Sequence, residues 1–226
     1  MKKFFLFAIA IVAAMTVNAE QIIFTEVAAK GSLNGKSFSD GELVLSITDE
    51  GQNKLEVDSN SCYFGTAEAQ EKFALRLKTG GKSQVKEDAT NALLLTVPSA
   101  GDLFICARTG SNSATDRNVA LVQDGDTILN HVLLESEAIK VKGLDTENPD
   151  KETNVYPVLS CKVAEGDINI FYPVGAINFY SFVFQADGGQ GVENIDATVK
   201  AEKRFENGQL VIIKNGVRYN ALGTQF

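Results

Sequence analysis

The sequence predicts an all-β protein, an antiparallel β-sandwich of the jelly-roll type that is followed by a short C-terminal β-hairpin. Short β-prone runs alternate with glycine-containing turn signals at a spacing of about ten residues, which is typical of sandwiches and barrels. The run Ile177 to Phe184, INFYSFVF, is continuously apolar and aromatic, as expected of a strand buried on both faces. Phenylalanine is the dominant aromatic residue, with 14 copies against no tryptophan, so we expect a phenylalanine-rich core within residues 20–187.

The N-terminal residues have the organisation of a secretory signal peptide. Met1 to Lys3 carry positive charge, Phe4 to Val17 form an apolar run, and small residues precede a cleavage site after Ala19. The run is shorter than the roughly twenty residues that a transmembrane helix needs. We therefore predict that residues 1–19 are removed and that the mature protein is exported. Its first residue would be Glu20, which lacks the thiol that a lipid anchor requires.

The mature chain is acidic. Without Lys2 and Lys3, 19 of the 21 basic residues remain against 29 acidic ones, so the formal net charge falls from −8 to −10. Basic residues do not cluster in the sequence, whereas binding to a phosphate backbone needs a positive patch. Nucleic acid is therefore not expected as a partner.

In the first half of the mature chain, glycines separate short strands. We predict these strands at Gln21–Val27, Leu43–Ile47, Lys54–Val57 and Phe73–Leu77. The last of them alternates apolar with polar residues, which indicates a half-buried strand. The preceding stretch from Thr66 to Phe73 has helical composition, and it predicts one or two helical turns.

The second half carries stronger turn signals. Asp124-Gly125-Asp126 separates the predicted strands 118–123 and 127–134 as a tight hairpin turn would. Further strands are predicted at 93–97, 101–110, 155–163, 166–175 and 177–184, and LDTENPDKETN, residues 144–154, is the longest polar loop.

The three cysteines do not predict a disulfide or a metal site. Export would permit a disulfide, but an odd count leaves at least one of Cys62, Cys106 and Cys161 free or paired between chains. Cys106 and Cys161 lie within strand-like runs, so we interpret them as small core residues. Neither a CxxC spacing nor a Cys/His cluster is present, which argues against a structural zinc site.

No catalytic motif is apparent in the sequence. A nucleophile–histidine arrangement would have to use His131, the only histidine, which lies among apolar residues on a predicted strand. A glycosidase needs only two carboxylates, and Asp102 and Asp167, which both follow a glycine at a strand entrance, are candidates. Oxygen ligands for calcium, which we regard as a possible cofactor although the sequence lacks a DxDxDG loop, are available from Asp124, Asp126, Asp145, Glu147, Asn148 and Asp150.

Carbohydrate binding is a chemistry that β-sandwiches host well, because aromatic faces stack on sugar rings while polar groups bond the hydroxyls. Tryptophan, the usual stacking residue, is absent, so tyrosines would have to replace it. The candidate ligand-binding residues are Tyr63, Arg108, Arg117, Tyr156, Asn178 and Tyr180. Tyr172 is a further tyrosine in the same half of the chain, and burial in the core is the competing interpretation for each tyrosine.

The last residues form a separate β-rich segment. Leu210–Ile213 and Val217–Tyr219 are β-prone runs joined by Asn215-Gly216, which favours a type I′ hairpin turn. A glycine-rich link, DGGQG, separates them from the main domain, so we expect a flexible linker at 188–202. An isolated hairpin is only marginally stable in water, which points to a role other than stability.

This tail resembles the short C-terminal sorting signal of proteins that Bacteroidetes export through the type IX secretion system. The shared features are a basic start, an N-G-Q-L strand, an N-G turn and a terminal Y-N-x-x-G within residues 203–226. They fall on Lys203, Asn207, Gly208, Leu210, Asn215, Gly216, Tyr219, Asn220 and Gly223. The chain lacks the P-x-G-x-Y segment of longer sorting domains, so the resemblance is to the abbreviated form. It implies recognition by the secretion machinery and delivery to the cell surface or the medium.

Together these features predict an exported, non-catalytic binding or adhesion protein with carbohydrate as the leading ligand class. The main domain is similar in style to jelly-roll-like modules of polysaccharide-related surface proteins in those bacteria. Two alternatives stay open at this point. One is a small glycoside-active enzyme that uses two carboxylates, and the other is a purely structural surface protein.

Overall fold

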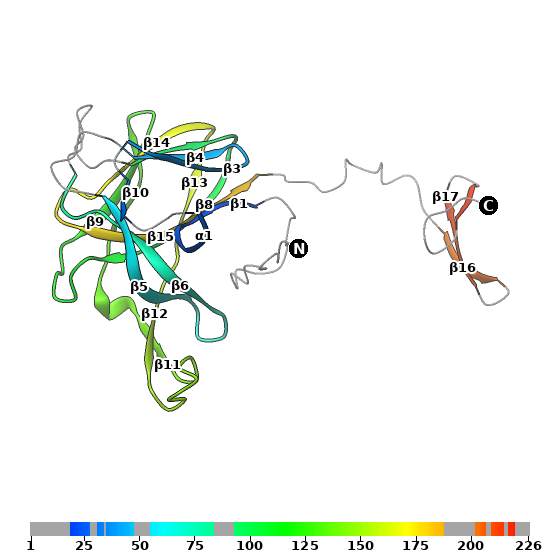
Figure 1. Cartoon of the computed structure of the whole chain (residues 1–226). Helices are drawn as coiled ribbons and strands as arrows, with labels where there is room; N and C mark the ends of the chain where they lie inside the picture. The colour runs from blue at the N-terminus through cyan, green and yellow to red at the C-terminus, as the bar shows by residue number, and fades with distance from the viewer. Residues whose placement is uncertain are drawn as a thin grey trace. The chain divides into compact units, whose positions relative to one another are not determined.

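The computed structural model of the chain describes residues 19–27, 31–33, 35–47, 55–83, 93–187, 202–206, 209–214 and 217–219 (Figure 1). It divides into two compact units, residues 1–189 and 190–226. The larger unit is a sandwich of two β-sheets, which confirms the predicted fold class. The predicted signal peptide up to residue 18 and the predicted linker up to residue 201 lie outside the described residues.

The first sheet forms one layer of the sandwich. Its strands are β1 (Ala19–Ile23), β2 (Gly31–Ser32), β5 (Glu56–Gly65), β6 (Gln70–Lys78), β8 (Gly101–Thr109), β11 (Ile139–Val141), β12 (Thr153–Tyr156), β13 (Leu159–Val163) and β15 (Ile177–Ala186). Their order is β11-β12-β5-β6-β15-β8-β13, with β1 paired to β15 and β2 to β5. Within this order β12 pairs with β5 in parallel, and the other described pairs are antiparallel.

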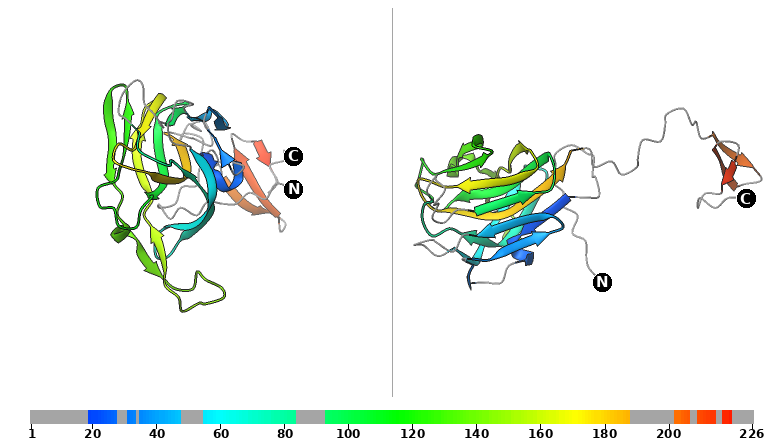
Figure 2. Two further views of the ribbon diagram at one scale, coloured as in Figure 1. Left: turned by 60° about the vertical axis from the view of Figure 1, so that its left-hand side comes forward. Right: turned by 90° about the horizontal axis from the view of Figure 1, so that it is seen from above.

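The second sheet forms the other layer and is antiparallel throughout its described pairs. It runs in the order β10 (Asp126–Val132), β9 (Asn118–Gln123), β14 (Gly166–Phe171), β7 (Leu93–Val97), β4 (Leu43–Ile47) and β3 (Ser37–Asp40). Figure 2 shows the two layers from two further directions.

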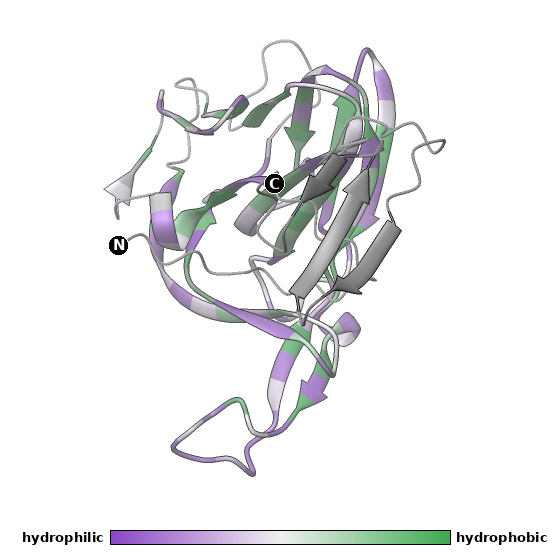
Figure 3. Cartoon of the chain, turned by 90° about the vertical axis from the view of Figure 1, so that its right-hand side faces the viewer, coloured by the Kyte–Doolittle hydropathy of each residue, from purple (hydrophilic) through white to green (hydrophobic). Residues whose placement is uncertain are grey.

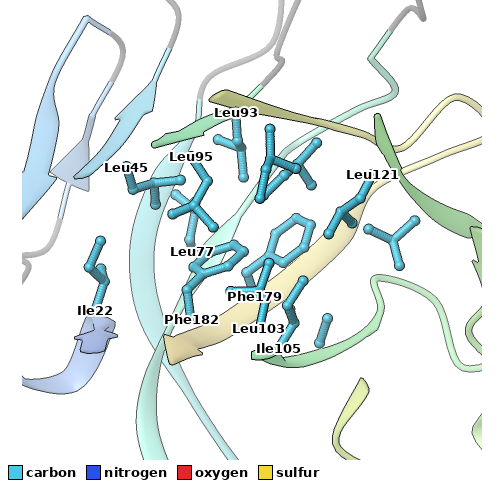
Figure 4. Packing of buried hydrophobic residues seen from close by; sticks show 14 of the residues in the cluster. Ile22, Leu45, Leu77, Leu93, Leu95, Leu103, Ile105, Leu121, Phe179 and Phe182 are labelled. Carbon is cyan, nitrogen blue, oxygen red and sulfur yellow. The ribbon is translucent and has the colours of Figure 1, made fainter. Parts of the chain in front are cut away.

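The main core lies between the sheets and follows from strand alternation. In β4 and β7 every second residue is buried. Figure 3 shows that many strands of the sandwich carry strongly hydrophobic residues, while loops are mostly hydrophilic. Leu45, Leu95 and Leu121 of the second sheet lie opposite Phe179 and Phe182 of the first (Figure 4). Burying each such side chain contributes about 1.5–3 kcal/mol, so this layer supplies most of the apolar driving force.

A second, smaller cluster of buried residues is separate from the main core. Its members are Ile23, Cys62, Phe64, Phe73, Cys106, Tyr156 and Tyr180. On β8, Cys106 faces this second cluster while its neighbours Ile105 and Ala107 face the main core. On β15 the register shifts between Phe179 and Ser181, so that Phe179 and Phe182, three residues apart, both face the main core while Tyr180 between them faces the second cluster.

Strand β6 contributes to both the main core and the second cluster, because only its last two residues pair with β15. Leu77 belongs to the main core and Phe73 to the second cluster, although both lie on the same face of β6. β6 pairs with β15 only through Leu77 and Lys78, and β1 takes the rest of that edge. Just before the β6 residues that pair with β15, Thr25 Oγ1 accepts hydrogen bonds from the backbone N–H groups of Ala74 (3.1 Å) and Leu75 (3.2 Å).

Thr25 belongs to a one-turn helix, α1 (Phe24–Val27), so the predicted strand 21–27 is confirmed only as far as Ile23, where β1 ends. The predicted helical turns at 66–73 are also wrong. Thr66 N–H bonds Ala69 C=O at 2.8 Å in a tight turn, and β6 begins at Gln70. Tertiary pairing overrides the helical composition there, because β5 and β6 form a hairpin that the turn must close.

Two further sequence predictions are confirmed and one is corrected. The β9–β10 hairpin turns at Asp124 (φ 52°) and Gly125 (φ 86°), the two positive φ values that a type I′ turn needs. β15 is buried along eight consecutive residues, as predicted for Ile177–Phe184. The predicted strand 155–163 is instead two strands, because Pro157, which has no N–H to donate, falls between β12 and β13.

The smaller unit is a three-stranded antiparallel sheet. β17 (Gln209–Lys214) pairs with β18 (Val217–Tyr219), as predicted, and also with β16 (Glu202–Glu206), which was not predicted. Lys203 lies on β16, Leu210 on β17 and Tyr219 on β18. The other sorting-signal positions lie outside the described residues. Across the described parts of both units, no helix is long and apolar enough to cross a membrane.

Candidate functional site

A polar pocket of about 390 Å³ opens where β5, β8 and β12 of the first sheet meet the segments around residues 112, 135 and 151. The hairpin of β11 and β12, which includes the 142–152 loop, projects beyond the two layers of the sandwich (Figure 1). Residues of this hairpin form one side of the pocket. The pocket is lined by Ser61, Cys62, Tyr63, Arg108, Asn112, Glu135, Lys151, Glu152, Thr153, Asn154 and Tyr156. Three of the six predicted ligand-binding residues are therefore brought together here: Tyr63, Arg108 and Tyr156.

A hydrogen-bonded network of three side chains forms part of the pocket wall. Glu135, in the 3-10 helix η1 (Glu135–Glu137), accepts a bond from Arg108 Nη2 on Oε1 (2.8 Å) and one from Tyr156 Oη on Oε2 (2.6 Å). The Arg108 guanidinium lies over the Tyr156 ring, 4.8 Å from its centroid. Each side chain thus fixes the other two, and both carboxylate oxygens keep further acceptor capacity.

Asn112 extends the network toward solvent. Its Oδ1 accepts a second bond from Arg108 Nη2, at 2.8 Å. Because arginine only donates, Asn112 has to present its oxygen to Arg108, and its NH₂ group faces elsewhere as a donor. The pocket therefore offers a carboxylate acceptor and an amide donor whose orientations are both set by Arg108.

Raised pKa values keep Tyr156 and Cys62 neutral and Arg108 positively charged at neutral pH. Burial, and then the hydrogen bond to Glu135, raise the pKa of Tyr156 to about 12. Burial alone would lower the pKa of Arg108, but the nearby Tyr156 and Glu135 raise it overall. Burial also raises the pKa of the Cys62 thiol to about 11 despite the charge of Arg108, so Cys62 is a poor nucleophile.

The 142–152 loop is held beside the pocket by Asp145 and Tyr63. Asp145 Oδ1 accepts the backbone N–H groups of Glu147 (3.1 Å) and Asn148 (3.2 Å), and Oδ2 binds Lys151 Nζ at 2.9 Å. These bonds, led by the one from Lys151, lower the pKa of Asp145. Tyr63 Oη donates to Leu144 C=O at 3.1 Å, and Lys72 Nζ lies 5.7 Å from its ring centroid.

The other three predicted ligand-binding residues lie away from the pocket. Tyr180 is fully buried and donates to Asn60 Oδ1 at 2.9 Å, while Asn178 is 3% exposed and donates to Thr109 C=O at 3.3 Å. Arg117 Nη1 donates to Ala176 C=O at 3.0 Å and packs over Gly175. These residues support the fold around the site and do not line it.

The predicted carboxylate pair is not brought together. Asp102 lies on β8 in the first sheet with Lys162 at 3.0 Å, whereas Asp167 lies on β14 in the second sheet and accepts a bond from Thr96 Oγ1 at 2.6 Å. His131 Nε2 on β10 lies 2.9 Å from Glu137 Oε1, which is also outside the pocket. Of the proposed calcium ligands, Asp145 bonds its own loop and Lys151. The described part of the chain holds no group of three or more histidines, cysteines, aspartates or glutamates placed to bind a metal ion.

Several pocket residues were not predicted, and Glu135 is the most important. It follows the apolar run around His131, where the sequence gives no indication that a carboxylate meets Arg108, 27 residues earlier. Asn112 lies four residues after Arg108 in a serine-rich turn, a placement typical of any surface loop. Lys151 and Asn154 fall within the predicted polar loop 144–154, whose length was the one available signal, although the structure places Asn154 on β12.

Comparisons with known proteins add little to this geometry. No family model matches the chain, and no curated protein does. One solved structure that matches is a chain from a study of glycan recognition in the cellulosome of Ruminococcus flavefaciens. It is 13% identical and aligns with a TM-score of 0.36 over 75% of this chain and 94% of that chain. This similarity is too distant to assign a ligand.

Proposed function

We propose that the mature chain is an exported, non-catalytic binding protein whose pocket takes a sugar unit of a glycan. The observation that carries this proposal is the Arg108–Glu135–Tyr156 network, which holds a carboxylate, a guanidinium and a phenol ring in fixed positions. Binding groups held by such a supporting network lose little conformational entropy when a ligand arrives.

The chemistry of the pocket suits a sugar hydroxyl, which both donates and accepts hydrogen bonds. Glu135 offers acceptor oxygens, the Asn112 amide offers a donor, and hydrogen bonds to ionised groups are about twice as strong as neutral ones. Tyr63 provides aromatic surface at the rim, against which the C–H face of a sugar can pack. A volume of about 390 Å³ lies within the range of small-ligand sites.

A glycan array probed with the mature chain, residues 20–226, tests the proposal. Glu135→Gln and Asn112→Ala should each weaken binding of any glycan retained, by about tenfold, since each removes or displaces one hydrogen-bonding group. Asn130→Ala is a matched control, because Asn130 is an exposed asparagine whose Oδ1 accepts one bond, from Asn118 at 2.7 Å. Absence of binding across the array, or turnover of a bound glycan, would sink the proposal.

We further propose that the C-terminal unit is a sorting signal that directs this module to the cell surface. Support comes from the resemblance of residues 203–226 to such signals and from the three-stranded sheet of β16, β17 and β18 in this segment. Removing residues 202–226 in the native host should leave the folded module in the periplasm. Replacing residues 188–201 with a glycine–serine segment of equal length is the control. Surface display of the truncated chain would show the assignment to be wrong.

A further inference from the structure

The pocket lining contains four charged side chains, and each already has an oppositely charged partner within the protein. Arg108 pairs with Glu135 at 2.8 Å and Lys151 with Asp145 at 2.9 Å. Glu152 pairs more loosely with Lys140, at 3.5 Å. The lining itself contributes two positive and two negative charges, so its formal charge is balanced.

The rest of the polar lining is neutral. Ser61, Thr153, Asn112 and Asn154 contribute hydroxyl and amide groups, which each offer both a donor and an acceptor. An ionised ligand gains little from such groups, because they solvate a charge less well than the water that it leaves behind. A ligand made of hydroxyl groups replaces its hydrogen bonds to water with equivalent bonds to the pocket. The lining therefore matches an uncharged, hydroxyl-rich ligand.

An anionic sugar would meet a specific obstacle in this pocket. Its carboxylate would have to compete with Glu135 for Arg108, or with Asp145 for Lys151. The first exchange would leave the partly buried Glu135, whose side chain is 22% exposed, without its cation. Removing one partner of such a pair costs several times more than an exposed pair contributes. The mature chain, with a formal charge of −10, also repels polyanions at a distance.

We infer that the pocket selects neutral sugars over uronic acids and other anionic sugars. This inference rests on the proposed glycan-binding function and narrows its ligand class. The ion pairs within the protein cause this selectivity. They hold hydrogen-bonding groups in fixed positions for a neutral sugar, and because each charge is already paired, they do not attract an anionic one.

The experiment compares matched neutral and acidic oligosaccharides on the mature chain. Galactose and galacturonic acid oligomers of the same linkage, and likewise glucose and glucuronic acid oligomers, differ only at C6, which carries a hydroxymethyl group in the neutral sugar and a carboxylate in the acid. By isothermal titration, the neutral member of a bound pair should bind at least about tenfold more tightly, equivalent to 1.4 kcal/mol. Binding of the neutral member should also change by less than about twofold between 0.05 and 0.5 M NaCl, since no charge is neutralised.

A charge-altering variant provides the second arm. Glu135→Gln leaves Arg108 without its anion, so the ratio of neutral to acidic affinity should fall by about tenfold or more. Glu165→Gln makes the same change in net charge at an exposed position outside the pocket and should leave the ratio unchanged. An acidic member that binds as well as its neutral counterpart overturns the inference and leaves the glycan-binding function standing. No binding of either kind, with the folded state verified by circular dichroism, overturns the proposed function and this inference with it.

Discussion

The main core and the second cluster are both buried, yet they have different chemistry and different consequences. The main core is filled almost entirely with leucine, isoleucine, valine and phenylalanine, and its role is to hold the two sheets together. The second cluster includes Cys62, Cys106, Tyr156 and Tyr180, and it borders the pocket. The second cluster therefore contributes side chains with polar atoms, those of Cys62 and Tyr156, to the lining of the pocket.

The two regions also differ in how they satisfy polar groups. Tyr156 and Tyr180 in the second cluster each donate their hydroxyl to a partner, Glu135 and Asn60. Tyr172, in the main core, has a buried hydroxyl that bonds no partner among the described residues. We therefore expect substitutions to act through packing in the main core and through hydrogen bonds and charge in the second cluster.

The largest expected effect is loss of packing in the main core. Phe179 stacks on Phe182 with ring centroids 5.4 Å apart and meets Tyr172 edge-on at 6.2 Å. Phe179→Ala should lower the free energy of unfolding by about 3–5 kcal/mol, because it removes a buried ring and leaves a cavity. Urea denaturation followed by circular dichroism measures this. A loss below about 1 kcal/mol would mean that the two sheets do not depend on this layer.

A smaller effect is expected where a hydrogen bond to a charged group is lost. Tyr156→Phe keeps the ring under Arg108 but leaves Glu135 one donor short, which should lower the free energy of unfolding by about 2 kcal/mol. The same variant should weaken ligand binding, since Glu135 loses one of the two bonds that orient it. Unchanged stability and unchanged binding would show that the network does not organise the pocket.

The next effect concerns pH and Glu71, which faces Phe64 across the β5–β6 pair. Burial, and then the charge of Glu26, raise the pKa of Glu71 from its ordinary value near 4.5 to about 7. Between these values the folded state holds a proton that the unfolded state releases, so the free energy of unfolding should fall as pH rises through that window.

Glu71→Gln should remove this part of the slope, on the order of 1 kcal/mol because solvent partly screens the site. Urea midpoints on either side of the window measure the effect, with Glu165→Gln as an exposed control. If wild type and Glu71→Gln show the same pH dependence, Glu71 is ionised across the window and its environment is more polar than the structure implies.

The smallest effects are expected from substitutions of two further tyrosines. The difference between their changes in unfolding free energy compares the second cluster, which holds Tyr180, with the main core, which holds Tyr172. Tyr180→Phe removes a hydrogen bond to the neutral Asn60 and should cost about 1 kcal/mol. Tyr172→Phe removes a buried hydroxyl without a described partner, so it should be neutral or slightly stabilising. Thermal unfolding of both variants tests this order, and the reverse order would contradict it.

Much of the fold could be read from the sequence because strand alternation and turn chemistry are local. β4 and β7 have the predicted bounds, and the Asp124-Gly125 turn adopts the backbone angles that those residue types favour. The errors occur where pairing partners override local preference. Thr66–Ala69 forms a tight turn between β5 and β6. After Ile23 the chain forms the helix α1, beside the part of β6 that does not pair with β15.

The candidate site was only partly predictable. Residue type identified Tyr63, Arg108 and Tyr156, because aromatic and guanidinium groups suit sugar recognition, but it also selected Tyr180 and Asn178, which the structure buries. Glu135 carries no local signal, since its importance comes from contact with two residues that are distant in the sequence. A β-bulge at Tyr180 and the early departure of β6 from β15 decide which side chains meet, and neither is encoded in a local pattern.

The two layers of this protein follow from its sequence, because the period of apolar residues and the turn residues specify which strand faces are buried. The acidic net charge of the chain and the β-rich character of its C-terminal segment also follow from the sequence. The network of Arg108, Glu135 and Tyr156 depends instead on long-range contacts, because strand order and register bring together residues that are far apart in the chain. The fold follows from repeated local preferences, whereas the site depends on a few long-range contacts.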